Sequence, residues 1–72
     1  MNKEDIRQYI ELNTFIKRQA LAATGGQAKL LIRSGKVIVN GAVETRNKKK
    51  LSKGDVVEVE GKRFVVGEII AR

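Results

Sequence analysis

Residues 24–41 of this 72-residue chain have the sequence TGGQAKLLIRSGKVIVNG, and this stretch decides the fold. Thr24 followed three residues later by Gln27 has the form of a capping box, the pair that opens a helix. Gly35 stands where a left-handed C-terminal cap is usually found. Together the two signals predict a helix of about nine residues between them.

The predicted helix has two different faces. Its apolar positions fall at i, i+3 and i+4 and form an inward stripe: Ala28, Leu31 and Ile32. The cationic positions fall at i, i+4 and i+7 and form an outward stripe: Lys29, Arg33 and Lys36. This helix is therefore predicted to pack on a core with one side and to present positive charge with the other.

After the helix the period of the sequence changes to two residues. Val37 and Val39 then point one way along a predicted strand, and Asn40-Gly41 is the commonest two-residue hairpin turn. Val43 resumes on the return strand. Residues 46–50 are polar and cationic and predict a loop.

Further strands follow this loop. Leu51 returns to the core, and residues 52–55 predict a turn. Residues 56–59 and 63–66 predict two more strands, joined through Glu60-Gly61-Lys62.

Upstream of residue 24 the pattern predicts an arm and a first helix. Residues 7–12 alternate polar and apolar side chains, as a short edge strand or an extended arm would, with Tyr9 expected to anchor it. Asn13 or Thr14 could open a helix from about Thr14 to Ala23, with Phe15, Ile16 and Ala20 available to the core. The sequence thus predicts an α+β fold, two short helices packed on a small antiparallel sheet, in one domain over residues 1–72.

Composition excludes several classes of site. The chain has no cysteine and no histidine, which excludes disulfides, thiolate or imidazole catalysis and the usual zinc sites. We expect no cofactor and no metal. There is no apolar run long enough to span a bilayer, and the chain opens with acids and not with a signal segment. We therefore expect a cytoplasmic protein with no membrane partner.

The positive charge is concentrated in the middle of the chain. The formal net charge is +7, yet residues 17–53 alone carry ten cations and one acid, Glu44, a net charge of +9. Residues 1–16 and 54–72 each sum to −1. Lysines that merely fill solvated positions are the alternative, but segregation of this kind favours a patch that binds an anionic partner.

The fixed order of glycines, hairpin turn and apolar positions also resembles a known family. Ala28-Lys29, Ile32, Gly35, Val37, Val39 and Asn40-Gly41 resemble the core of the RNA-binding domain named after ribosomal small-subunit protein four, the S-four domain. Leu12-Asn13-x-Phe15-Ile16 and Leu51-x-x-Gly54-Asp55 are similar to its first helix and its closing turn. The resemblance covers about residues 11–59, and it implies the fold called the alpha-L RNA-binding motif.

The resemblance implies structured RNA as the partner, with ribosomal RNA in ribosome assembly or maturation as the first expectation and transfer RNA as the second. Short stand-alone bacterial members resemble this chain in the glycine pair and in residues 41–46. The family's RNA surface is the second helix with the adjoining strand and loop. The residues expected to bind RNA are Lys17, Arg18, Thr24, Gly25, Gly26, Lys29, Arg33, Lys36, Arg46, Lys48, Lys49 and Lys50.

The chain departs from the family pattern at the start of both helices. Thr24-Gly25 stands where most members have a Ser-Arg pair, and Glu11-Leu12-Asn13 where Arg-Leu-Asp is usual. The missing arginine removes a cation that the family commonly uses. Gly25-Gly26 could compensate, because bare backbone at a helix N-terminus lets a phosphate approach partly positive amides. Alternatively the glycines only permit a tight turn between the helices.

Other functions are less consistent with these residues. The chain has only three aromatic residues, so base stacking cannot dominate and recognition of RNA shape and backbone is expected. A DNA reader would need a longer recognition helix, and the acids Asp55, Glu58 and Glu60 are explained as turn and strand-surface residues. We expect a non-enzymatic monomer with no small-molecule substrate. An adaptor that docks on an acidic protein is the alternative.

Overall fold

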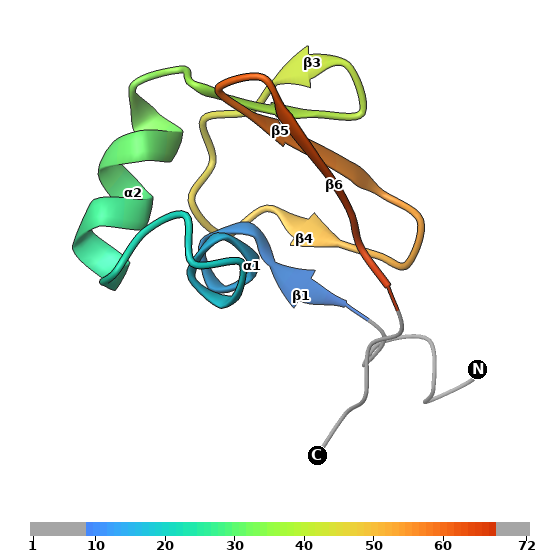
Figure 1. Ribbon diagram of the computed structural model, residues 1–72, viewed down its shortest axis with the longest axis horizontal. Coiled ribbons are helices and arrows are strands. Elements are labelled where there is room, and N and C mark those ends of the chain that lie inside the picture. Colours follow the sequence, from blue (N-terminus) through green and yellow to red (C-terminus); the bar gives the residue numbers. More distant parts are fainter. Residues whose placement is uncertain (1–8, 68–72) are drawn as a thin grey trace.

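The computed structural model describes residues 9–67, and within them the predicted α+β architecture is confirmed. The elements, in chain order, are β1 (Ile10–Glu11), α1 (Leu12–Arg18), α2 (Gly25–Arg33), β2 (Val37–Val39), β3 (Ala42–Val43), β4 (Lys50–Leu51), β5 (Val56–Val59) and β6 (Lys62–Val65). All strand pairs are antiparallel. Four strands form a sheet in the order β3-β2-β5-β6, and β1 pairs with β4 in a separate two-stranded sheet. In Figure 1, α2 lies at one end of the molecule and the turn between β4 and β5 at the other.

The core lies between the two helices and one face of the larger sheet. Alternate residues of β2 and β5 are buried and stand opposite each other, Val37 with Val59 and Val39 with Val57. This period of two places one side of each strand against the helices. The remaining buried side chains of the core are Leu12, Phe15, Ile16, Ala28, Ile32, Leu51 and Val66.

The hairpin turn has the predicted geometry and also ties two parts of the chain together. Asn40 and Gly41 both have a positive φ, 51° and 86°, as a two-residue turn of this type requires. The Asn40 side-chain oxygen accepts from the Val56 amide at 2.9 Å, and its nitrogen donates to Asp55 at 3.2 Å. Asp55 in turn accepts from the Ser52 amide at 2.7 Å. Asn40 and Asp55 therefore link the turn between β2 and β3 to the start of β5.

Helix α2 begins and ends as predicted. Thr24 Oγ1 accepts from the Gln27 amide at 3.1 Å, and Gln27 Oε1 accepts from the Ala23 amide at 2.9 Å, one residue before its usual partner in a capping box. Gly35 has φ +84°, which confirms the left-handed cap. Of the predicted inward stripe, Ala28 and Ile32 are fully buried and Leu31 is half-buried.

Helix α1 differs from the prediction at both ends. It was expected at Thr14–Ala23 but runs from Leu12 to Arg18, and its N-cap residue makes no side-chain hydrogen bond. Asn13, one of the two residues expected to accept from the first amides, does accept from the Thr14 amide with its Oδ1 at 2.8 Å. The Leu12 amide donates to the Lys49 carbonyl at 2.8 Å, so the helix starts on a distant loop. It ends early because Ala20 adopts φ +61°, and the amides of Ala20 and Leu21 then close on the last turn at 2.9 and 3.1 Å. Ala20, expected to be available to the core, is exposed.

Three strand predictions also need correction. Lys50, expected in a loop, lies in β4, and the last strand spans Lys62–Val65 and not residues 63–66. Leu12, expected in the arm, is the first residue of α1. Residues 7 and 8 of the expected arm lie outside the described residues.

Candidate nucleic-acid interface

The helical part of the expected interface is exposed. Lys29 and Arg33 lie on α2 one helical turn apart, and Lys36 follows just after the helix. All three are exposed, as the outward stripe predicted. These cations can therefore reach an anion in solvent without a change of the core.

The start of α2 brings together residues from both helices. A Cβ atom added at Gly25 would lie 4.0 Å from Lys17 Nζ, so the ammonium group of α1 stands beside the first turn of α2. Gly25, Gly26 and Arg18 are exposed, whereas the hydroxyl of Thr24 is used by the helix itself. An ammonium group next to amides with a partial positive charge is suited to an anionic group such as phosphate.

The other cations lie on residues 44–49, which we call the basic loop, and on β4. The loop leaves β3, passes on the α2 side of the sheet and reaches β4 (Figure 1). Its backbone is fixed to the start of α1, because the carbonyls of Asn47 and Lys49 accept from the first two amides of that helix at 3.1 and 2.8 Å. Arg46 and Lys48 are exposed and Lys49 is half-buried. The backbone of the basic loop is therefore fixed by hydrogen bonds to α1, while its cationic side chains are exposed or half-buried.

Arg46 forms an ion pair that the sequence analysis missed. Its Nε and Nη2 donate to the two carboxylate oxygens of Glu44 at 2.8 and 3.1 Å. The pKa of Glu44 is lowered to about 2, mainly by the side-chain hydrogen bond from Arg46. Burial opposes this shift, and the positive charge of Lys49 adds to it. A signal was present in the sequence, since side chains two residues apart in extended chain lie on the same side.

Lys50 is also engaged. Its Nζ lies 5.0 Å from the centre of the Tyr9 ring, within the range of a cation–π contact. Lys50 belongs to β4 and Tyr9 immediately precedes β1, which pairs with β4. Lys50, one of the residues predicted to bind RNA, therefore contacts the Tyr9 ring in this structure.

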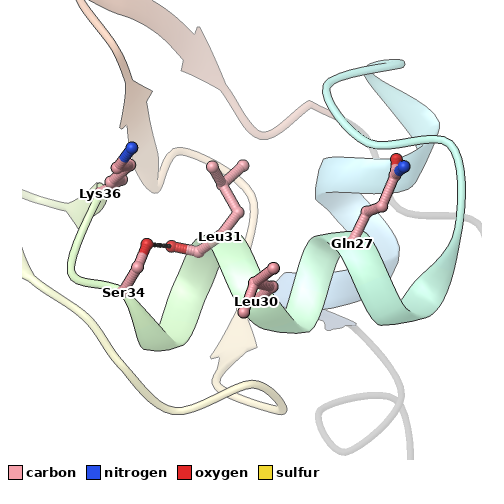
Figure 2. A pocket seen from close by; sticks show the side chains of 5 residues that line it. All are labelled: Gln27, Leu30, Leu31, Ser34 and Lys36. Atoms are coloured by element: carbon pink, nitrogen blue, oxygen red, sulfur yellow. Dashed lines mark hydrogen bonds between the residues drawn. The ribbon is translucent and has the colours of Figure 1, made fainter.

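A shallow hollow lies along α2 and extends to Lys36 (Figure 2). It is lined by Gln27, Leu30, Leu31, Ser34 and Lys36. The Ser34 hydroxyl donates to the Leu31 carbonyl at 2.9 Å, and Leu30 is 71% exposed. The hollow has a volume of about 250 Å³, which is below the roughly 300–1,000 Å³ of typical small-molecule sites.

Comparison with known proteins identifies the family. The model of the family described as S4 domain matches residues 4–67 of the chain. This chain belongs to the S4 domain family. The resemblance inferred from residues 11–59 is thereby confirmed.

Two curated relatives of this S4 domain have informative names. The Escherichia coli (strain K12) protein named "Putative RNA-binding protein YbcJ" is 40% identical over 53 residues, which cover 74% of this chain and 76% of the relative. The Bacillus subtilis (strain 168) protein named "Probable ribosome maturation protein RlbA" is 39% identical over 54 residues, covering 75% of this chain and 76% of the relative. The aligned region thus extends over most of each protein.

The described part of this S4 domain contains neither a metal-binding cluster nor a membrane-spanning helix. Among residues 9–67 no group of three or more acidic, cysteine or histidine side chains is arranged to hold a metal ion. Neither α1 nor α2 meets the length and hydropathy that a membrane-spanning helix requires.

Proposed function

We propose that this S4 domain binds structured RNA through a basic face made of α2, the basic loop and the flanking cations of α1. Ribosomal RNA during ribosome assembly or maturation is the proposed target, and transfer RNA is the second candidate. The protein acts as a non-enzymatic monomer. The name of the Bacillus subtilis relative supports the link to the ribosome.

The observation that carries the proposal is the segregation of charge. Residues 17–53 have a net charge of +9, while the two flanks are each −1. Lys29, Arg33 and Lys48 of this segment are exposed, and so are the two cations of α1. Cations of this kind neutralise phosphates and release their counterions, which supplies affinity without base-specific contacts.

Charge reversal tests the face. In the triple variant Lys29→Glu, Arg33→Glu and Lys49→Glu we expect affinity for deproteinised ribosomal RNA to fall at least about tenfold. Circular dichroism should show an unchanged fold, because none of the three side chains belongs to the core. Wild-type affinity in the folded triple variant would reject the assigned face.

A matched pair of variants separates the face from net charge. Lys29→Glu and Lys53→Glu each lower the net charge from +7 to +5. Lys53 lies in the turn between β4 and β5, and this turn is at the opposite end of the molecule from α2 (Figure 1). We expect the α2 variant to weaken binding several-fold more than the control variant. Equal effects would indicate that only net charge matters.

The adaptor alternative makes a different prediction. A complex held by RNA should shift in sedimentation when a lysate is treated with RNase. A complex with an acidic protein should sediment unchanged after the same treatment.

A further inference from the structure

Glu44 is the one acid between Lys17 and Lys53, and its charge is of the wrong sign for an RNA surface. Considered as a charge alone, it should repel phosphates and weaken binding. Its carboxylate is not free, however. It accepts three hydrogen bonds from Arg46, two from the guanidinium group at 2.8 and 3.1 Å and one from the backbone amide at 3.0 Å.

The two partners are exposed to different degrees. The side chain of Glu44 is 13% exposed and that of Arg46 is 70% exposed. The carboxylate therefore lies against the protein, while the guanidinium group faces solvent. A guanidinium group has five N–H donors, and two of them are used here, so three remain for a phosphate.

Glu44 also has a fixed backbone. Its amide donates to the Val37 carbonyl at 2.9 Å, which continues the ladder of the β2–β3 hairpin. The far end of the basic loop is held by α1, and the Lys49 amide donates to the Arg46 carbonyl at 3.2 Å. Glu44 thus holds Arg46 within a loop that is anchored at both ends.

We propose that Glu44 is a positioning residue for RNA binding, which increases affinity by holding Arg46 and the basic loop in the geometry that contacts phosphate. The inference rests on the proposed RNA-binding function. Its physical basis is that a loop ordered before binding does not lose conformational freedom on binding. The gain from this order exceeds the repulsion by a carboxylate whose charge Arg46 already neutralises.

The sign of one substitution decides the question. For Glu44→Gln we expect affinity for deproteinised ribosomal RNA to fall about three- to tenfold, although the net charge becomes more positive. Glu58→Gln is the matched control, because Glu58 also accepts from an arginine, Arg63 Nε at 3.1 Å, but on β5 and β6. This control should bind as tightly as wild type or more tightly. Equal or tighter binding by folded Glu44→Gln would overturn the proposal.

A second variant keeps the test independent of charge. Glu44→Asp leaves the net charge unchanged and shortens the side chain by one methylene, so a charge effect predicts wild-type affinity and positioning predicts weaker binding. Wild-type affinity in Glu44→Asp would overturn the proposal even if Glu44→Gln did not fold.

A double-mutant cycle tests whether Glu44 acts through Arg46. If it does, adding Glu44→Gln to the Arg46→Gln variant should cause little further loss of affinity. Each single variant should also reduce the steepness of the salt dependence by about 0.7 to 0.9, the value expected for the loss of one phosphate contact. A loss of fold stability alone would lower the active fraction and leave this slope unchanged. Additive effects, or an unchanged slope, would overturn the assignment. Loss of RNA binding by wild type itself would instead reject the proposed function.

Discussion

The two helices are neighbours in the core but are built in different ways. Helix α2 begins and ends with its own residues, Thr24 and Gly35, each of which satisfies or shapes a helix terminus locally. Helix α1 begins on the carbonyls of Asn47 and Lys49, more than thirty residues further along the chain. The difference shows that α1 and the basic loop form one unit, whereas α2 is formed by local signals.

This difference matters for the proposed RNA face. The cations of α2 are placed by a helix that the sequence specifies by itself. Those of the basic loop are placed by a tertiary contact with the amides of α1 at one end and by the side chain of Glu44 at the other. Changes in α1 should therefore alter the loop, and changes in the α2 caps should act mainly on stability.

Threonine-to-alanine variants at the two helix starts test the comparison. Thr24→Ala removes the side-chain oxygen that accepts from Gln27, so we expect the free energy of unfolding to fall by about 1 kcal/mol. For a domain of this size that corresponds to a melting temperature lower by roughly 4–8 °C. Thr14→Ala should change the free energy of unfolding by less than about 0.5 kcal/mol, because the Thr14 hydroxyl makes only a 3.5 Å contact with Asn13 Oδ1 and caps no amide of α1. Equal losses in thermal melts would contradict the comparison.

Alanine and glycine exchanges at the two helix ends should change the free energy of unfolding by a smaller amount, and the two changes should be opposite in sign. Both ends have a residue with positive φ, Ala20 at 61° and Gly35 at 84°. The left-handed conformation destabilises the folded state by roughly 1–2 kcal/mol for a residue with a Cβ. Alanine offsets roughly 0.4–1 kcal/mol of this, because its unfolded chain has less conformational entropy than that of glycine. Ala20→Gly should thus raise the free energy of unfolding by about 0.5–1 kcal/mol, and Gly35→Ala should lower it by about as much. Urea titrations measure both, and changes of the same sign would show that the caps are not equivalent.

The same contrast explains what the sequence could predict. Helix α2, the Asn40-Gly41 turn and the buried Val37 and Val39 depend on local patterns, and they were predicted closely. The bounds of α1 were wrong because its start depends on a loop that is distant in sequence. Its end depends on Ala20, a residue that does not signal a left-handed cap.

The candidate site shows the same division. The exposed cations of α2 were predicted from their spacing, and the family resemblance was confirmed by the match over residues 4–67. The Glu44–Arg46 pair and the Lys50–Tyr9 contact were missed. The first pair had a sequence signal, since side chains two residues apart in extended chain lie on the same side. The second joins residues that are distant in sequence and meet only because β1 pairs with β4.

The salt dependence of RNA affinity tests the central claim most directly. Wild-type protein should be titrated with deproteinised ribosomal RNA at several salt concentrations, and the logarithm of the association constant plotted against that of the salt concentration. If about five cations of the basic face contact phosphates, the slope should be roughly −4. A slope near zero would contradict the account, because it would mean that the concentrated positive charge takes no part in binding.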